Sequence, residues 1–169
     1  MKKNLLFTMS VVLLMAGSAI DLSEVQDRAS AIMLAWYPGA RGGKAVADLL
    51  FGEASPSGKL PLTFYHNEAL DEMPDFTDYS MENRTYRYYE GEALYPFGYG
   101  LSYGDVAVTG LEADKLSAYV TVENRSRVDC EEVVQLYVKD EASTHAPTNP
   151  VLCGFKRVAL KAGEKRRLS

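Results

Sequence analysis

Ser18, Asp21 and His66 are of the residue types that form a hydrolytic triad. A serine beside a histidine that a carboxylate orients is the arrangement that activates a hydroxyl nucleophile. Ser18 lacks the G-x-S-x-G turn that presents such a nucleophile in one large class of hydrolases. A turn and a helix start explain Ser18 and Asp21 more simply, so the sequence does not favour this triad.

A second pattern, "AWYPGARGGKAVADLLFG" at 35–52, places glycines and a lysine at a predicted helix start. A phosphate-binding loop needs glycine, four residues and then Gly-Lys-Ser/Thr. Pro38 stands where that first glycine belongs, and Ala45 stands where the hydroxyl belongs. The glycines do not fit a dinucleotide fingerprint either. We therefore expect Pro-Gly to turn the chain and Gly42–Gly43 to let the helix start lie close to another backbone.

The remaining polar patterns are weaker. His66 and His145, with the acids beside them, are too few to predict a metal site. Glu90 and Glu92 form a carboxylate pair in a loop, where solvated charge is the usual reason for such a pair. The sequence predicts no metal and no cofactor. The triplets "NRT" at 83–85 and "NRS" at 124–126 match the N-glycosylation pattern, which is short enough to occur by chance.

Composition restricts the class of protein. A hydrophobic content of 47% with 24% charged residues is typical of a globular chain. The net charge of −5 and the confinement of the basic run to 164–167 argue against nucleic-acid binding. We interpret that run as a solvated strand edge. Cys130 and Cys153 form neither a disulfide framework nor a zinc motif, so two free, buried thiols are expected.

The first 19 residues, "MKKNLLFTMSVVLLMAGSA", allow two interpretations. Two lysines, an apolar run and a small-residue end fit a secretory signal, which would make the protein secreted or periplasmic. The same run fits a buried strand at about 10–16, especially because Ser23 and Gln26 directly afterwards match a capping box. We favour the strand and with it a cytoplasmic protein. The run is too short to span a membrane.

The first third alternates between strand and helix patterns. After the strand at 10–16 we expect a helix over 23–30, a strand in "AIMLAWYPG", a helix in "GKAVADLLFG" and a strand in "KLPLTFY". This β-α-β-α-β order predicts a parallel sheet with right-handed crossovers, too small to be a complete doubly wound domain.

The rest of the chain divides in two. Residues 67–104 hold more than half of the eleven tyrosines, and we expect this long connection to pack on a surface. From 105 to 169 short alternating strands between turns predict an all-β sandwich that is incomplete. The predicted domains are thus 1–66, the connection 67–104, and 105–169.

Longer blocks of sequence carry a family resemblance. "AWYPGARGGKAVADLLFGEASPSGKLPLTFY" and "TYRYYEGEALYPFGYGLSY" resemble two signatures of glycoside hydrolase family 3, which contains β-glucosidases and β-xylosidases. "EEVVQLYVKD" and "VLCGFKRVALKAGE" resemble the fibronectin type III-like domain of that family. The resemblance implies a carboxyl-terminal fragment with the end of an α/β sandwich domain and part of the fibronectin-like domain. "SVVLLMAGSAIDLS" resembles the strand and turn before the first signature, which supports the strand over the signal.

Two positions depart from the family pattern. Ala40 and Arg41 replace the acidic or amide pair that often follows Pro-Gly, so no substrate contact is carried over to this loop. Cys130 replaces a glycine, and we expect this change to affect only a turn.

The resemblance also implies a mechanism. Members of the family are retaining enzymes with two catalytic carboxylates, whose nucleophile lies in an amino-terminal barrel and whose acid/base lies ahead of the first signature. No Asp or Glu here lies in a matching motif, so no catalytic residue is assigned, and the chain alone is predicted to be inactive. The substrate of the parent enzyme would be a β-linked oligosaccharide or glycoside, and the partner would be the missing catalytic domain. The alternative is a non-catalytic carbohydrate-binding or scaffold module.

Four residues are predicted to lie near substrate because ligands collect beyond the carboxyl ends of parallel strands: Ser18, Trp36, Tyr37 and His66. An aromatic ring there could stack on a sugar. The alternative is that Trp36 and Tyr37 fill the contact with a neighbouring domain.

Overall fold

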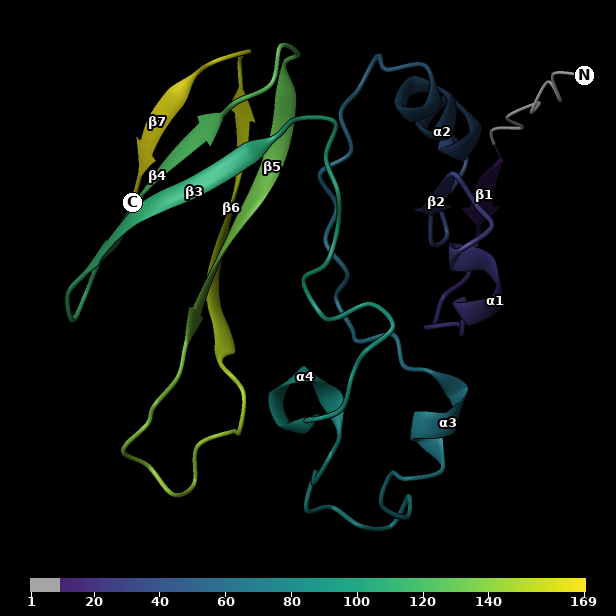
Figure 1. Cartoon of the computed structure of the whole chain (residues 1–169), viewed down its shortest axis with the longest axis vertical. Helices are drawn as coiled ribbons and strands as arrows, with labels where there is room; N and C mark the ends of the chain where they lie inside the picture. Colours follow the sequence, from purple (N-terminus) through teal and green to yellow (C-terminus); the bar gives the residue numbers. More distant parts are fainter. Residues whose placement is uncertain (1–9) are drawn as a thin grey trace, which may run out of the picture.

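The computed structural model describes residues 10–169, which form a mixed α/β part, a long connection and an all-β part (Figure 1). We call residues 10–66 the α/β part, 67–104 the connection and 105–169 the sandwich part. In Figure 1 the strands of the sandwich part lie on the left, α1, α2, β1 and β2 lie on the right, and the connection runs between and below them. The signal-peptide interpretation depends on residues 1–9, which lie outside the described residues.

The α/β part contains one two-stranded parallel sheet. β1 (Val11–Leu14) pairs with β2 (Ala31–Leu34) in parallel register. The crossover between them contains α1 (Ser23–Gln26), as expected for parallel neighbours. The predicted strand in the apolar run and its parallel partner are therefore confirmed.

The start of α1 differs from the prediction. Leu22 is the N-cap residue, and no side chain caps the helix. The capping-box prediction is wrong because the Ser23 hydroxyl donates to the Asp21 carboxylate instead of accepting a backbone N–H. The helix also ends at Gln26, shorter than the predicted 23–30.

The glycine-rich loop leads into α2 (Gly42–Leu50), close to the predicted bounds. A Cβ on Gly42 would lie 2.6 Å from the ring of Pro38, so only glycine fits there. Gly43 has open space around it, so close approach does not explain the second glycine. Gly52, with φ of +78°, follows the helix end and confirms the predicted stop.

The predicted third parallel strand, "KLPLTFY", is wrong. This segment pairs with the connection instead: Phe64 and Tyr95 form an isolated antiparallel bridge. Leu60 N–H donates to the Tyr99 carbonyl, and Gly98 N–H donates to the Leu60 carbonyl. Pro61 has no N–H with which to continue a ladder, which limits regular pairing here.

The connection holds two single-turn helices, α3 (Asn67–Leu70) and α4 (Thr85–Tyr88), and several of its aromatic residues pack as predicted, whereas Phe76 and Tyr79 are exposed. The rings of Tyr86 and Phe97 stack with their centroids 3.9 Å apart. Phe97 also meets Tyr137 of the sandwich part edge-on at 6.4 Å. The connection is therefore a packed layer between the two parts and not a free linker.

The sandwich part consists of two antiparallel sheets. The strands are β3 (Val106–Ala113), β4 (Ala118–Asn124), β5 (Cys130–Val138), β6 (Val151–Leu160) and β7 (Lys165–Leu168). One sheet has the order β3-β4-β7, and the other pairs β5 with β6. β7 is an edge strand, which confirms the interpretation of the basic run at 164–167.

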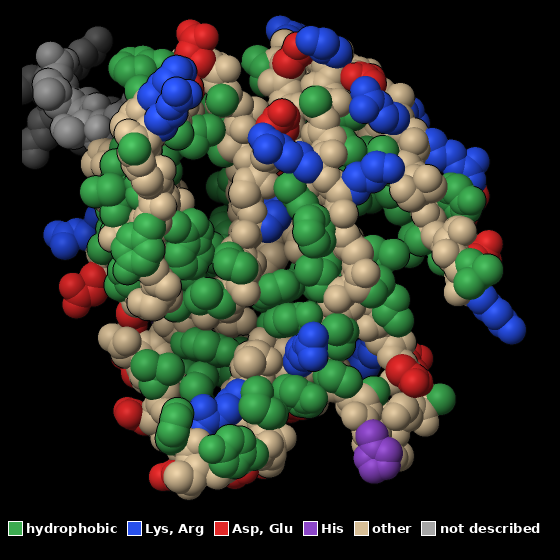
Figure 2. All heavy atoms as spheres, turned by 180° about the vertical axis from the view of Figure 1, so that it is seen from behind, with side chains coloured by type: hydrophobic (Ala, Val, Ile, Leu, Met, Phe, Trp, Pro, Cys, Tyr) green, Lys and Arg blue, Asp and Glu red, His purple; other side chains and the backbone are tan. Residues whose placement is uncertain are grey.

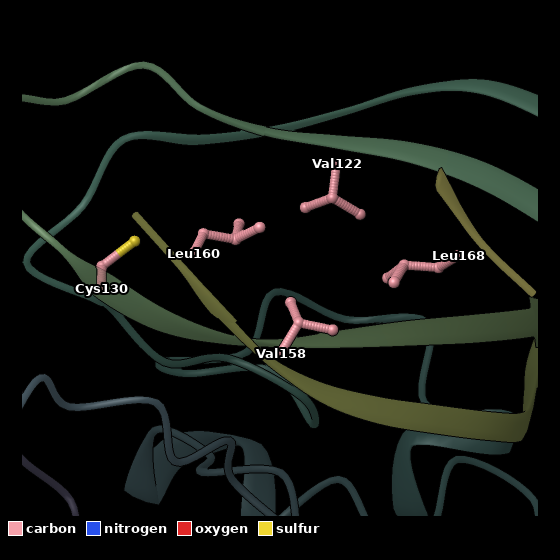
Figure 3. Packing of buried hydrophobic residues seen from close by; sticks show 5 residues of the cluster. All are labelled: Val122, Cys130, Val158, Leu160 and Leu168. Carbon is pink, nitrogen blue, oxygen red and sulfur yellow. The ribbon is translucent and has the colours of Figure 1, made fainter. Parts of the chain in front are cut away.

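The core of this part lies between the two sheets, where five side chains point toward one another (Figure 3): Val122, Cys130, Val158, Leu160 and Leu168. Val122 is fully buried, and Leu160 is 2% exposed. Cys130 is the first residue of β5 and packs in this core, so the expectation that it affects only a turn is wrong. Burial raises the pKa of its thiol.

Cys153 differs from the predicted buried thiol, because it is exposed. Leu136 pairs with Gly154 and Tyr137 pairs with Leu152, so Cys153 is the extra residue of a bulge in β6. A bulge leaves one residue out of the ladder and turns its side chain away from the regular alternation. The prediction of strand burial did not include this irregularity.

A buried amide joins the strand ends of the sandwich part. Asn124 is fully buried, and its Nδ2 donates to the carbonyls of Val128 at 2.8 Å and Lys161 at 3.1 Å. Its Oδ1 accepts from the hydroxyl of Ser126 at 2.6 Å. Asn124 therefore replaces backbone pairing where three segments meet.

Candidate functional site

One of the predicted substrate-adjacent residues, Trp36, packs against a small core in the α/β part. Leu22, Phe64 and Leu94 are buried and form its centre. Trp36 and Leu34 pack against them. The core thus joins the crossover after β1, the segment after α2 and the connection, and it fixes the side chains on its border.

Trp36 and Tyr37 follow β2, as predicted, but they lie in different environments. Trp36 is half-buried against the small core and has φ of +50°. A non-glycine residue in the left-handed region is uncommon and costs conformational energy. Tyr37 is 80% exposed, and its ring lies so close to Gly17 that a Cβ there would collide with it. Tyr37 is therefore the aromatic residue of this pair that is open to solvent.

His66 lies in a hydrogen-bonded cluster with Asp21 and Ser23. The Ser23 hydroxyl donates to Asp21 Oδ1 at 2.5 Å, and Ser23 Oγ lies 2.9 Å from His66 Nδ1. The backbone N–H of Asn67 donates to Asp21 Oδ2 at 2.8 Å. The cluster ties the start of the connection to the crossover after β1.

In this cluster Ser23 lies between Asp21 and His66, and this order cannot activate the Ser23 hydroxyl as a nucleophile. The hydroxyl proton of Ser23 points to the carboxylate, so His66 Nδ1 must carry a proton and donate it to Ser23 Oγ. A catalytic histidine would accept the hydroxyl proton and would itself be held by the carboxylate. The Ser23 hydroxyl, followed by the Ser23 and Asn67 N–H groups, holds the pKa of the Asp21 carboxyl below its ordinary value. The cluster is a structural tie.

Ser18 is exposed and takes no part in this cluster. Within residues 10–169 no hydrogen bond joins Ser18 to Asp21 or His66. The structure therefore brings Asp21 and His66 together through Ser23, the residue assigned to capping, and leaves Ser18 apart. The signal for the cluster was the D-x-S spacing, since an aspartate commonly accepts hydrogen bonds from the residue two positions later.

The carboxyl groups with displaced pKa values all shift in one direction across residues 10–169. Hydroxyl or backbone donors lower the pKa of Asp75, Asp78 and Asp114. A hydrogen bond from Lys161 does the same for Asp129. A general acid in glycoside hydrolysis needs a raised pKa so that it keeps its proton at working pH. None of these groups has that property, and Glu90 and Glu92 are exposed in a loop, as predicted.

The described part of the chain contains neither a metal-binding cluster nor a membrane-spanning helix. No group of three or more His, Cys, Asp or Glu residues is arranged to hold a metal ion there. No helix among the same residues has the length and apolar character needed to cross a bilayer.

Two family models match the chain. The glycosyl hydrolase family 3 C-terminal domain matches residues 5–103, and the fibronectin type III-like domain matches residues 132–169. The order of the two matches agrees with the α/β part and the sandwich part described above. The chain belongs to glycosyl hydrolase family 3.

Similar proteins include a xylan 1,4-beta-xylosidase of Xylanibacter ruminicola, 43% identical over 88% of this chain and 18% of its own length. A periplasmic beta-glucosidase of Salmonella typhimurium is 34% identical over 94% of the chain and 23% of its own length. The crystal structure of a family 3 beta-glucosidase of Bifidobacterium adolescentis superposes with a TM-score of 0.79 at 36% identity, over 94% of this chain and 26% of that one. The chain thus spans about a fifth to a quarter of the length of these relatives.

Proposed function

We propose that this chain forms the carboxyl-terminal part of a retaining β-glycosidase whose two catalytic carboxylates lie on other polypeptide. The enzyme would remove terminal non-reducing sugars from β-glycosides. The names of the relatives point to β-xylosides and β-glucosides as the substrate class. On its own the chain would not hydrolyse glycosides.

The observation that carries the proposal is the uncovered parallel sheet. Val11 and Leu13 on one face of β1 are 47% and 42% exposed, and Met15 directly after the strand is 66% exposed. Parallel sheets are normally covered on both faces, and two strands alone bury too little area to be stable. An apolar face of this kind needs covering by protein. The longer relatives have that additional length, so we infer that the β1–β2 sheet is part of a larger α/β sandwich.

The second support is chemical. A retaining mechanism needs one carboxylate to attack the anomeric carbon and one carboxylic acid to protonate the leaving oxygen. Every displaced pKa among the described carboxyl groups is lowered, so none of these groups has the raised pKa of the general acid. The residues of this chain would therefore support and shape the site without supplying the proton donor.

A labelling experiment tests the inactivity of the chain. A 2-deoxy-2-fluoro β-glycoside with a good leaving group traps the glycosyl-enzyme intermediate on the nucleophilic carboxylate of a retaining enzyme. Mass spectrometry of the purified chain after incubation should show no added sugar. A labelled Asp or Glu would overturn the proposal, and so would hydrolysis of an aryl β-xyloside or β-glucoside by the chain alone.

A complementation experiment tests the larger enzyme. The chain is coexpressed with the part of the Xylanibacter ruminicola enzyme that precedes the matched segment, and hydrolysis of an aryl β-xyloside is measured. We expect activity to appear with both pieces. Leu13→Arg on the uncovered sheet face should abolish it, while the matched control Leu116→Arg, at a position 96% exposed on the β3–β4 hairpin, should not. Equal activity in both variants would contradict docking through β1.

We also propose that the apolar run serves the protein as strand β1 and not as a cleaved signal. Intact-mass analysis of the expressed protein should find Val11–Leu14 retained. Cleavage after the small residues that follow this run would favour an exported protein instead.

A further inference from the structure

The segment that leads into α4 has an unusual backbone. Met81, Asn83 and Thr85 have φ of +64°, +52° and +56°, all in the left-handed region. Asparagine adopts this region fairly readily, but a β-branched residue such as threonine does so only under constraint. The Thr85 side chain is exposed, so packing of that side chain does not impose the conformation. The constraint must therefore come from the segments on either side of Thr85.

On the amino-terminal side, residues 74–84 form a closed loop between α3 and α4, at the bottom of Figure 1, that we call the lid loop. The Arg84 guanidinium donates to the Pro74 carbonyl and, at 2.9 Å, to the Asp75 carbonyl, and so joins the two ends of the loop. Inside the loop the Asp78 N–H donates to the Asp75 carbonyl at 2.9 Å. Compact loops whose ends meet are held together by their own contacts. We therefore expect the lid loop to move as one body.

On the carboxyl-terminal side, α4 is fixed to the sandwich part by hydrogen bonds that we call the latch. The Asn149 side chain donates to the carbonyls of Tyr86 at 3.0 Å and Tyr89 at 2.7 Å. The Asn149 N–H donates to the Arg87 carbonyl at 2.9 Å, and the Leu152 N–H donates to the Tyr86 hydroxyl at 3.1 Å. A helix of one turn has end carbonyls without internal partners, so the latch stabilises it.

The lid loop carries two aromatic rings that are open to water. Phe76 is 87% exposed and Tyr79 is 85% exposed. Moving a side chain of this size out of water is favourable, because much apolar area is buried. A position of the lid loop that covers these rings is therefore favoured unless other contacts oppose it.

A hollow of about 930 Å³ gives the lid loop room to move. Its walls include Glu82 and Asn83 of the lid loop, together with Tyr88 of α4 and Thr148 beside the latch. The walls thus come from both sides of Thr85 in the chain. Hinges are a few residues at element ends that absorb a change of backbone angle. Rotation at Thr85 would narrow the hollow and keep the bonds inside the lid loop intact.

We propose that the lid loop swings about Thr85 between the open position described above and a closed position that fills the hollow, and that the latch holds it open. Release of Asn149 removes the constraint on α4, so Thr85 returns to an ordinary φ. Relief of this strain and burial of Phe76 and Tyr79 then favour the closed position. The hinge, the latch and the hollow all belong to this chain, so the device is independent of the proposed function.

Electron paramagnetic resonance on the 169-residue chain measures the position of the lid loop. Spin labels are attached through Thr77→Cys in the lid loop and Thr144→Cys in the sandwich part, and Cys153→Ser removes the exposed thiol. We expect one distance between the labels in this background and a second, shorter distance when Asn149→Ala opens the latch. Asn67→Ala is the matched control, because that side chain is exposed, and it should keep the single distance.

Amide hydrogen exchange separates a swinging lid loop from an unfolded one. In Asn149→Ala the Tyr89 amide, which donates to the Thr85 carbonyl at the hinge, should exchange about tenfold faster. The Asp78 amide, which is bonded inside the lid loop, should exchange at its former rate. Equally accelerated exchange at Asp78 would show that the loop unfolds and would overturn the proposal.

A second variant tests the latch if Asn149→Ala does not fold. Tyr86→Phe removes only the hydroxyl that accepts from the Leu152 N–H, so it should populate the shorter distance to a smaller extent. A single unchanged distance in every folded latch variant would overturn the proposal.

Glycine at the hinge tests the strain. Thr85→Gly should raise the thermal unfolding midpoint by about 2–4 °C, because glycine adopts a positive φ without strain. The same change should reduce the share of the shorter distance in the Asn149→Ala chain. Thr148→Gly, at an exposed position with an ordinary φ, is the matched control and should lower the midpoint, since it only adds freedom to the unfolded chain. Equal shifts in the two glycine variants would show that Thr85 stores no strain and would also overturn the proposal.

Discussion

The two ends of the molecule bury their apolar side chains to different degrees. In the sandwich part Val122 is fully buried and Leu160 is 2% exposed, because two sheets face each other across them. In the α/β part Leu13 is 42% exposed on a sheet of two strands, with no layer on that face among the described residues. The sandwich part therefore has a closed core of its own, while the sheet of the α/β part has one apolar face uncovered. We infer that the sandwich part folds independently and that the α/β part depends on additional protein.

The surface opposite to the view of Figure 1 is drawn in Figure 2. It shows hydrophobic side chains across its middle and many of its Lys and Arg side chains toward the top. Several basic side chains of the sandwich part are paired with acids, among them Lys161 with Asp129 and Arg167 with Glu112. Exposed pairs of this kind contribute little to stability, so burial and not surface charge distinguishes the two parts.

The largest expected effect tests the contrast directly. Leu160→Ala should lower the free energy of unfolding by about 2–5 kcal/mol, because it leaves a cavity in a closed core. Leu13→Ala should cost less than about 1 kcal/mol in the chain alone, since much of that side chain is already in water. Urea denaturation followed by circular dichroism measures both. Equal losses would contradict the contrast.

The buried amide in the sandwich part should give the next largest effect. Asn124→Ala removes the donor to the Leu160 and Lys161 carbonyls and to the Val128 carbonyl, which keeps only the Ser126 hydroxyl, at a cost of about 2–3 kcal/mol. Asn67→Ala is the control, because that side chain is exposed and only its backbone N–H is used. The thermal unfolding midpoint of Asn124→Ala should lie clearly below that of Asn67→Ala. A loss of less than about 1 kcal/mol for Asn124→Ala would show that water reaches these carbonyls.

An ion pair between the two parts should give a smaller effect. Lys59 and Glu132 lie 2.6 Å apart, with side chains 16% and 15% exposed. Glu132→Gln leaves a partly buried ammonium without its counter-charge, and we expect a loss of about 1–2 kcal/mol. Asp129→Asn, which breaks the exposed pair with Lys161, should cost under about 1 kcal/mol. If the first loss does not exceed the second, the coupling between the parts is weaker than the structure indicates.

The smallest effect concerns pH. The pKa of the Asp21 carboxyl is lowered in the folded chain, mainly by the Ser23 hydroxyl, from an ordinary value of 3.8. Its contribution to stability is therefore complete above that value and is lost as the pH falls toward the folded pKa. Asp21→Asn should reduce the loss of stability between pH 5 and pH 2. Urea midpoints of the variant and of the unmodified chain across this range measure the change. If the stability of Asp21→Asn falls between pH 5 and pH 2 as steeply as that of the unmodified chain, the role assigned to this carboxylate is contradicted.

Sequence patterns predicted the strands of the sandwich part and the β1–β2 pair, because alternation and apolar runs report burial over several residues. They failed where a single irregularity or a distant partner decides the structure. Pro61 and the pairing of Phe64 with Tyr95 removed the third parallel strand, and one bulge exposed Cys153.

The site was predicted less completely than the fold. The positions of Trp36 and Tyr37 after β2 follow from strand order, but the left-handed backbone of Trp36 has no signal in the sequence. The link from Asp21 through Ser23 to His66 spans 45 positions and depends on how the connection returns to the crossover.

The buried position of Asn124 also bears on the choice of expression host. The triplet Asn124-Arg125-Ser126 matches the acceptor pattern of oligosaccharyltransferase, which acts on nascent chains before they fold. A glycan attached there would prevent the two sheets from meeting, because the amide nitrogen that would carry it is inside the closed fold. Material secreted from yeast or insect cells would then contain a misfolded, glycosylated fraction that bacterial preparations lack.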